Sequence, residues 1–286
     1  MNIRIIPRLD IKGPNLVKGI HFEGLRVLGK PENFARHYFE QGADELIYMD
    51  AVASLYGRNS LAAIVERTSR EIFIPLSVGG GLRSVDDIRA VLRAGADKVS
   101  LNTAAVARPE LIREASRAFG SSTIVVSIEA IRRKDGTYEA YTDYGRQASG
   151  RNAVEWAVQA VELGAGELVV TSIDCEGTAH GYDLALTKLV AELVPVPVIA
   201  SGGAGTAAHV CEVVRDGCAD AVSLASLLHY NRIRHAGDAG DDFASEGNIE
   251  FLKGGATYSR TEDVSLRDIK RALQASGIDC RYEAVS

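Results

Sequence analysis

Two carboxylates are the residues of this sequence best suited to acid–base catalysis. Asp10 ends the apolar run RIIPRLD, and Glu129 lies at the matching place in the similar run IVVSIEA. Paired carboxylates that face each other are the usual groups for general acid and general base catalysis. An acid at a strand end can instead cap a helix, but equivalent positions in two similar runs favour a catalytic pair. We therefore predict that Asp10 and Glu129 are the catalytic residues.

Glycine-rich segments follow two other apolar runs. VGGG at 78–81 and SGGAG at 201–205 let backbone N–H groups approach an anion closely, because glycine has no side chain. Polar or small residues follow the next run in each half, where helix N-termini are expected. Each half thus offers one phosphate site, and the pair predicts a substrate with two phosphates. The predicted phosphate-binding residues are Gly80, Gly81, Asn102, Thr103, Ser201, Gly202, Gly203, Ala225 and Ser226.

Further substrate contacts are expected from polar residues near other run ends. Lys18 follows the first run and could bind a phosphate or orient the acids. Asp50 ends the second run and Thr171 ends the sixth, and Glu176 lies in the segment that follows the sixth run.

An internal repeat predicts the fold that must position these residues. GADEL at 42–46 returns as GAGEL at 164–168, and IPLSVGGG at 74–81 returns as VPVIASGGAG at 196–205. Eight β-branched apolar runs alternate with eight amphipathic segments, as in parallel strands covered by helices. The sequence predicts a (β/α)8 TIM barrel built from two repeated half-barrels, with its chemistry at the strand C-termini. An open doubly wound sheet is the alternative, but a repeat of four βα units favours closure. The expected helices span 31–41, 58–71, 84–94, 108–119, 151–163, 183–193, 205–216 and 265–276.

One segment departs from this alternation. Residues 235–263 are rich in glycine and aspartate and interrupt the eighth βα unit of a barrel predicted to span 1–286. A surface insertion is one interpretation. A lid or a partner-docking element beside the catalytic rim is the other.

Composition and charge narrow the class further. The net charge of −6 and the pI of about 5.6 argue against a nucleic-acid-binding protein. No apolar stretch approaches the ~20 residues of a membrane span, and the first residues do not form a secretory signal. The four cysteines show no metal-site spacing, so we expect no metal or cofactor, and reduced thiols suit a cytoplasmic enzyme.

These segments resemble the cyclase subunits of imidazole glycerol phosphate synthase, from histidine biosynthesis. The resemblance rests on RIIPRLDIKGPNLVKG, DELIYMD, VGGGLRS, ADKVSLNTAA, ELVVTSID and ASGGAG. It implies a lyase that uses ammonia to convert a bisphosphorylated ribulosyl-formimino aminoimidazole carboxamide into imidazole glycerol phosphate and aminoimidazole carboxamide ribotide. Asp10 matches the first catalytic aspartate of that family, and Glu129 stands where the family has its second.

The resemblance also implies a gate at the other end of the barrel. The family admits ammonia from a glutaminase partner through a ring of charged residues at the strand N-termini. The matching positions hold two bases and two acids, which suits closure by charge pairing. We therefore expect a glutaminase amidotransferase subunit to dock at the N-terminal face. The predicted gate residues are Arg4, Glu45, Lys98 and Glu167.

Two departures from the family keep other functions open. Glu129 and Glu176 each replace an aspartate, which moves a carboxylate outward by about one bond length. A reshaped pocket would suit a glutamine-dependent amidating synthase subunit that acts on a nucleotide-linked sugar in surface polysaccharide synthesis. The chain could also be an isomerase of an aminoaldose bisphosphate, or a non-catalytic activator of a glutaminase. The retained Asp10, Lys18 and both phosphate sites favour the cyclase.

Overall fold

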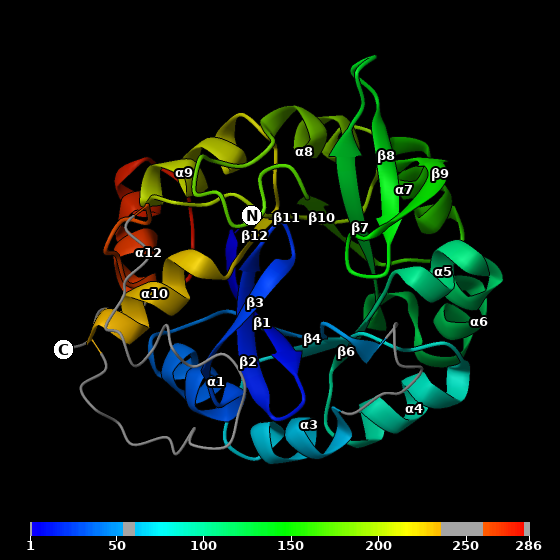
Figure 1. The fold of residues 1–286 in the computed structure, drawn as a ribbon, viewed down its shortest axis with the longest axis horizontal. Helices are drawn as coiled ribbons and strands as arrows, with labels where there is room; N and C mark the ends of the chain where they lie inside the picture. Colours follow the sequence, from blue (N-terminus) through cyan, green and yellow to red (C-terminus); the bar gives the residue numbers. More distant parts are fainter. Residues whose placement is uncertain (1, 54–60, 236–259, 283–286) are drawn as a thin grey trace.

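In residues 2–53, 61–235 and 260–282, which the computed structural model describes, eight parallel strands form a closed barrel (Figure 1). The first strand pairs with the last, Arg4 opposite Ala221, and the two central strands pair with each other, Glu167 opposite Val125. The ring therefore has no free edge, and the predicted (β/α)8 barrel is confirmed. Its strands are β1 (Arg4–Lys12), β4 (Leu46–Asp50), β5 (Leu76–Gly79), β6 (Lys98–Leu101), β7 (Ile124–Arg132), β10 (Glu167–Ser172), β11 (Val198–Ser201) and β12 (Ala221–Leu224).

Helices surround the barrel, and one lies within each predicted amphipathic segment. Ser84 begins its helix as a reciprocal capping box with Asp87, which satisfies two backbone N–H groups. Residues 58–60 of the second predicted helix lie outside the described residues. These helices are α1 (Pro31–Glu40), α3 (Ala62–Ser69), α4 (Val85–Arg93), α6 (Glu110–Phe119), α7 (Ala153–Glu162), α8 (Leu184–Ala191), α9 (Ala207–Arg215) and α12 (Leu266–Ala275).

Several described elements were not predicted from the amphipathic pattern. Helix α5 (Thr103–Ala107) follows β6, and α10 (Ser226–His235) follows β12. They occupy matching places in the two half-barrels and direct their N-termini at the strand ends. A 3-10 turn, η1 (Ser121–Thr123), precedes β7.

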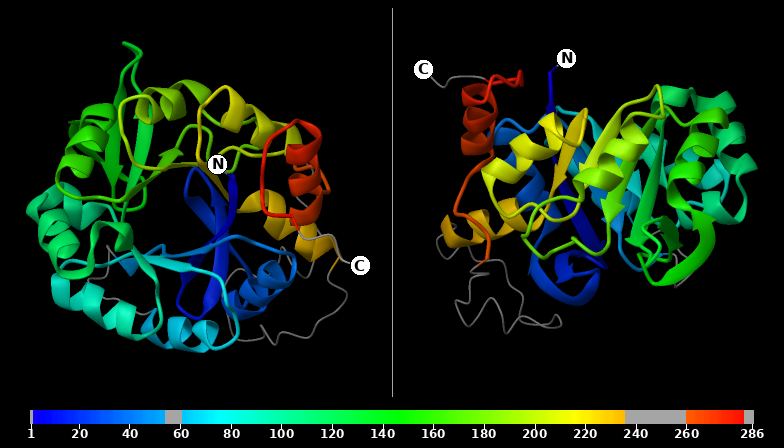
Figure 2. Two further views of the ribbon diagram at one scale, coloured as in Figure 1. Left: turned by 180° about the vertical axis from the view of Figure 1, so that it is seen from behind. Right: turned by 90° about the horizontal axis from the view of Figure 1, so that it is seen from above.

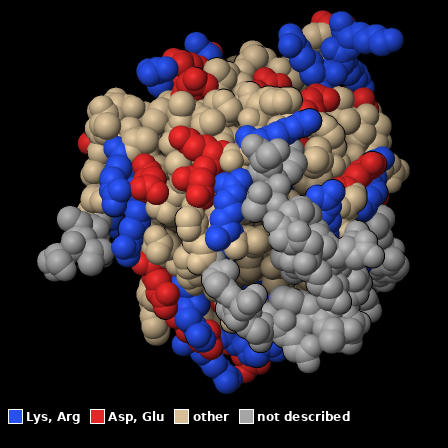
Figure 3. All heavy atoms as spheres, turned by 60° about the vertical axis from the view of Figure 1, so that its left-hand side comes forward, with Lys and Arg blue, Asp and Glu red and all other residues tan. Residues whose placement is uncertain are grey.

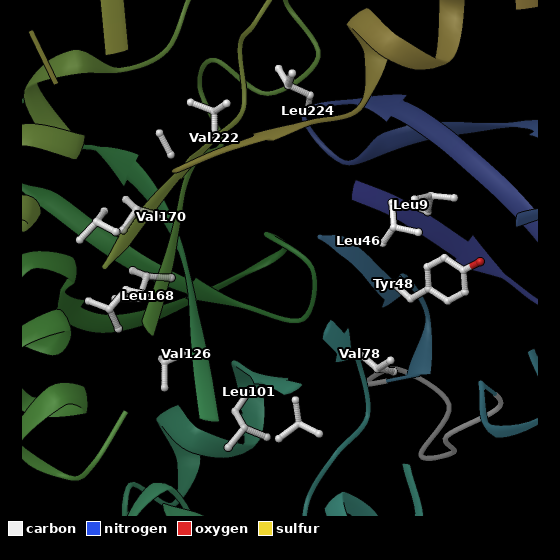
Figure 4. Close-up of a cluster of buried hydrophobic side chains, with 14 of the residues drawn as sticks. Leu9, Leu46, Tyr48, Val78, Leu101, Val126, Leu168, Val170, Val222 and Leu224 are labelled. Atoms are coloured by element: carbon white, nitrogen blue, oxygen red, sulfur yellow. The ribbon is translucent and has the colours of Figure 1, made fainter. Parts of the chain in front are cut away.

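Two buried apolar layers hold the barrel together. Alternate strand residues face outward and pack against the helices, as Figure 4 shows for Leu9, Tyr48 and Val126. The other residues face inward, where Ile6 and Val169 belong to a separate interior cluster. Each fully buried aliphatic side chain contributes about 1.5–3 kcal/mol relative to an exposed one. Burial on both faces explains the nearly continuous apolar runs in the sequence.

Each half-barrel also carries a β-hairpin after its first strand. In the first half β2 (Asn15–Ile20) pairs with β3 (Glu23–Gly29), and in the second half β8 (Tyr138–Thr142) pairs with β9 (Gln147–Asn152). The side view in Figure 2 places both hairpins on the side of the barrel opposite the N-terminus. Both hairpins therefore lie at the C-terminal ends of the barrel strands.

Most of the segment 235–263 lies outside the described residues, so its assignment as an insertion stays a prediction. Its last residues are held against the start of α9: the Glu262 backbone N–H donates to the Gly205 carbonyl at 2.8 Å, and the Ala207 N–H donates to the Glu262 carboxylate at 2.9 Å.

The surface drawn in Figure 3 carries acidic and basic side chains in small mixed groups. Of the helices that the structure describes, none combines the length and apolarity needed to cross a bilayer.

Candidate active site

Two cavities open at the C-terminal ends of the barrel strands, and together they collect most of the predicted site residues. The larger has a volume of about 320 Å³ and lies beside β5, β6 and β7. The smaller has a volume of about 30 Å³ and lies beside β1, β11 and β12. Asp50, Gly80, Gly81, Asn102, Thr103 and Glu129 line the larger cavity. Asp10, Lys18, Glu176, Ser201, Gly202, Gly203, Ala225 and Ser226 line the smaller one. Thr171 lines neither and is fully buried on β10.

Asp10 is buried and paired with a base from its own strand. The Arg8 Nε donates to the Asp10 Oδ1 at 2.9 Å, and both side chains are almost fully buried. Burial alone would raise the pKa of Asp10, but the Arg8 guanidinium and the Lys18 ammonium hold that pKa below its usual range. Asp10 is therefore a carboxylate at neutral pH.

The pKa of Glu129 is shifted in the direction opposite to that of Asp10. Burial raises the pKa of Glu129 to about 7, although Arg8 and a hydrogen bond from the Gly145 backbone oppose this shift. The Asn102 Nδ2 donates to the Glu129 Oε2 at 3.1 Å. Two carboxyl groups whose pKa values are moved apart can serve as a proton acceptor and a proton donor at the same pH.

Lys18 and Glu176 form a buried ion pair at the smaller cavity. Glu176 also accepts a hydrogen bond from the Phe22 backbone N–H at 3.0 Å, and its own carbonyl accepts one from the His21 N–H at 3.0 Å. The longer glutamate side chain therefore ties the β2–β3 hairpin to the loop after β10.

The tips of the two hairpins meet above the acids. Phe22 and Tyr144 each adopt a positive φ, 62° and 58°, and their ring centroids lie 4.3 Å apart. Phe22 lines the smaller cavity and Tyr144 lines the larger. Burial, and next the nearby Asp10 carboxylate, raise the pKa of Tyr144 well above its usual value. Tyr144 is therefore a neutral hydrogen-bond donor.

The glycine segments have the backbone geometry expected of anion sites. Gly80 has a φ of 98°, and an added Cβ would lie 2.6 Å from the Asp50 carbonyl oxygen. Gly203 has a φ of 112°, and an added Cβ would lie 1.9 Å from the Gly181 carbonyl oxygen. Only glycine fits both positions. Thr103 and Ser226 begin α5 and α10, whose unpaired backbone N–H groups suit a phosphate.

The four predicted gate residues form an alternating ring at the other end of the barrel. The Glu45 Oε2 accepts from the Arg4 Nη1 at 2.9 Å and from the Lys98 Nζ at 3.0 Å. Glu167 accepts from Lys98 at 2.9 Å and also pairs with Arg4. Burial, opposed by Lys98, raises the pKa of Glu45.

Sequence reasoning missed three residues of this site: Arg8, Phe22 and Tyr144. Arg8 offered a signal, because it is a charged residue inside an apolar run two positions before Asp10. Phe22 offered none. Tyr144 lies in a tyrosine-rich stretch, 138–144, for which a packed two-stranded excursion was the favoured interpretation and a substrate-covering role the alternative. The proximity of the two rings depends on two hairpins that are far apart in the sequence.

Metal binding was not expected, and the described residues offer no cluster of three or more histidine, cysteine, aspartate or glutamate side chains suited to a metal ion. All four cysteines are free.

A closed barrel of two repeated halves, with acids and glycine-rich segments at the strand C-termini, defines the class of (β/α)8-barrel proteins built from two repeated halves. The histidine biosynthesis protein family matches residues 4–234, and the chain belongs to this family. It is 58% identical over 204 residues to the imidazole glycerol phosphate synthase subunit HisF of Legionella pneumophila. That alignment covers 71% of this chain and 96% of the relative. The family resemblance found in the sequence is therefore confirmed.

Proposed function

We propose that this protein is the cyclase subunit of an imidazole glycerol phosphate synthase. It is a lyase that uses ammonia to convert the bisphosphorylated ribulosyl-formimino aminoimidazole carboxamide into imidazole glycerol phosphate and aminoimidazole carboxamide ribotide. The observation that carries the proposal is the placement of two acids, with pKa values moved in opposite directions, between two glycine-rich anion sites. The 58% identity to a subunit of that name supports the same reaction.

The two acids divide the proton transfers of this reaction. Protonated Glu129 donates a proton to the substrate, because its pKa of about 7 leaves much of it protonated at neutral pH. Asp10 accepts a proton, because it stays ionised. The segments around Gly80 and Gly203 each hold one phosphate and align the reactive middle of the substrate with the acids.

A glutaminase subunit supplies the ammonia at the N-terminal face of the barrel. The ring of Arg4, Glu45, Lys98 and Glu167 closes the barrel on that side. Two large apolar side chains are exposed in the loops that lead into barrel strands there, Phe73 at 80% and Leu193 at 57% exposure. Exposed apolar residues around a charged ring suit a protein partner.

The free thiols of all four cysteines suit the reducing cytoplasm, where we place this protein.

The test is turnover of the ribulosyl-formimino bisphosphate by the purified chain with excess ammonium salt. The wild type should release imidazole glycerol phosphate, and Asp10→Asn should lose this activity because it can no longer accept a proton. A wild type that is inert while Glu129→Asp gains activity would contradict the proposal. That result would instead favour amidation of another acceptor, such as a nucleotide-linked sugar.

Docking of the partner needs a second measurement. Glutamine-dependent turnover with a histidine-pathway glutaminase subunit should fall in Phe73→Glu, while ammonium-dependent turnover should stay unchanged. Leu189→Glu, an exposed apolar position on α8, is the matched control. Equal glutamine-dependent rates in the wild type and Phe73→Glu would remove Phe73 from the docking surface.

A further inference from the structure

The two half-barrels differ in chemistry just below the acids. Arg8 lies two residues before Asp10 on β1, and Ser127 lies two residues before Glu129 on β7. Both side chains face the barrel interior at matching places in the repeat. The serine lines the larger cavity of about 320 Å³, and the arginine lines the smaller cavity of about 30 Å³. The arginine therefore fills space that its counterpart leaves open.

The buried guanidinium group is only partly paired. Arg8 is 3% exposed, its Nε donates to Asp10, and its charged centre lies 5.3 Å from the centroid of the Phe22 ring. Among the described residues, no hydrogen-bond acceptor contacts the Arg8 Nη2. A buried charged donor without an acceptor carries an uncompensated desolvation cost. A buried arginine whose Nη2 has no acceptor in the protein points to an acceptor that the ligand provides.

The position of Arg8 restricts which part of a ligand it can reach. Its charge interacts with both Asp10 and Glu129, so it lies near both acids and not at either phosphate end alone. Lys18, the other base at the smaller cavity, is already paired with Glu176. Arg8 thus offers a donor to an oxygen in the middle of the substrate.

We propose that Arg8 is a catalytic residue whose Nη2 donates a hydrogen bond to the carbonyl oxygen of the ribulosyl unit, between Asp10 and Glu129. This inference rests on the proposed function, because it assigns a contact within that same substrate. Arginine suits this task, because its planar fork can pair with Asp10 through Nε and with the oxygen through Nη2 at once.

The step it assists balances in atoms and charge. Ammonia adds its lone pair to the carbonyl carbon, and the π-electron pair of the C=O bond moves to the oxygen, where the Arg8 N–H stabilises the negative charge. The carboxylic acid of Glu129 gives its proton to that oxygen, and the carboxylate of Asp10 takes one proton from the added nitrogen. A neutral carbinolamine results, with Glu129 ionised and Asp10 protonated.

A purely structural role for Arg8 makes a different prediction. If the arginine only neutralised Asp10, lysine would replace it with little loss, since a single ammonium can pair with that carboxylate. If the Arg8 Nη2 binds substrate, Arg8→Lys keeps the positive charge but loses this second hydrogen-bond donor. We expect kcat with excess ammonium to fall about 100-fold in Arg8→Lys, the usual loss for one oxyanion donor. KM for the bisphosphate should change far less, because both phosphate sites remain.

Rescue by small molecules provides a second readout. Guanidinium at a concentration that does not denature the protein should restore part of the activity of Arg8→Ala. Urea, which has a similar planar shape without the charge, should not. Arg132→Gln, an exposed arginine near the end of β7, is the control and should keep the wild-type kcat.

The outcomes separate the two proposals. A wild-type kcat in Arg8→Lys would overturn the catalytic role of Arg8 and leave the cyclase intact. A folded Arg8→Ala that guanidinium fails to rescue would also overturn it. If Arg8→Ala does not fold, the kcat of Arg8→Lys decides alone. An inert wild type would overturn the proposed function, and the role of Arg8 with it.

Discussion

The ring of Phe22 stacks at a tilt on the ring of Tyr144, with 4.3 Å between their centroids, and so joins the hairpin of one half-barrel to that of the other. The contact crosses the barrel mouth from the smaller cavity to the larger. Arg8 lies against one ring and Asp10 interacts with the hydroxyl of the other. The aromatic pair therefore covers the acids to which we assign the proton transfers.

Removing either ring should lower kcat and should also cost a small part of the free energy of unfolding. Phe22→Ala and Tyr144→Ala each remove a ring pair worth about 0.5–1.5 kcal/mol beyond its buried area. A double-mutant cycle on urea unfolding should return a coupling of that size, and kcat with ammonium should fall because water reaches the acids. Phe39 and Phe73 form a matched pair at the opposite end of the barrel, 5.9 Å apart. Phe39→Ala should leave the ammonium-dependent kcat unchanged.

Glu129 should make the protein less stable as pH rises. Its folded pKa of about 7 exceeds the ordinary value of 4.5, so the folded state binds the proton more tightly than the unfolded state. The stabilisation is complete below pH 4.5 and is lost as pH rises toward 7. Glu129→Gln should remove this loss and be more stable than the wild type at pH 8 by roughly 1–3 kcal/mol. Urea unfolding at pH 5 and pH 8 measures the difference, and Glu162→Gln, at an exposed position, should show none.

The same group should set a limb of the pH–rate profile. Measured at constant free ammonia, kcat/KM should fall above about pH 7 as Glu129 loses its proton. Glu129→Gln is the control: the pH–rate profile of its residual activity should not fall in this range. A wild-type limb that persists unchanged in Glu129→Gln would assign the titration to another group.

Crowding at the proposed phosphate site can be separated from backbone strain by substituting two glycines. Gly80→Ala places a Cβ 2.6 Å from the Asp50 carbonyl oxygen, whereas Gly136→Ala, at a similar φ of 86°, meets no heavy atom within 4 Å. Both variants should lose about 1–2 kcal/mol from the positive φ. Only Gly80→Ala should also raise the KM for the bisphosphate, by roughly tenfold or more. Equal KM values in the two variants would move the phosphate away from Gly80.

Removing one base from the proposed gate should destabilise the folded protein, because two buried acids lose a partner. In Lys98→Met, Glu45 and Glu167 lose the ammonium that lies 3.0 and 2.9 Å from them. We expect a loss of about 3 kcal/mol at pH 8, as for other broken buried pairs. The loss should shrink at pH 5, because the pKa of Glu45 is already raised and protonation relieves the repulsion. Adding Glu45→Gln should restore much of the stability, and urea unfolding at both pH values is the measurement.

The barrel could be predicted from sequence because its signals are local and repeated. Apolar runs, amphipathic segments and matched motifs such as GADEL and GAGEL each need only a few neighbouring residues. Helix N-termini were expected where α5 and α10 begin, but the extents of these helices were not predicted, because α5 has five residues and α10 has no clear apolar stripe. Their positions depend on the strands that they follow.

The site was predicted where residues lie at strand ends, and missed where it depends on contacts between distant segments. Asp10, Glu129 and both glycine segments line the cavities as expected. The opposite pKa shifts of the two acids could not be predicted, because they arise from burial and from Arg8 in three dimensions. The Lys18–Glu176 pair joins residues 158 positions apart and depends on the closed barrel.

Closure of the ring also determines how long the first strand must wait for its last partner during biosynthesis. Arg4 on β1 pairs with Ala221 on β12, so the first strand emerges from the ribosome long before its last partner exists. At about 5–20 residues per second, that wait is roughly 10–40 s. During this interval the nascent chain exposes a strand edge and the residues that later form the charged ring. The edge of β1 that is covered in the finished barrel is therefore exposed during synthesis. We expect the need for chaperones to be greatest in that period.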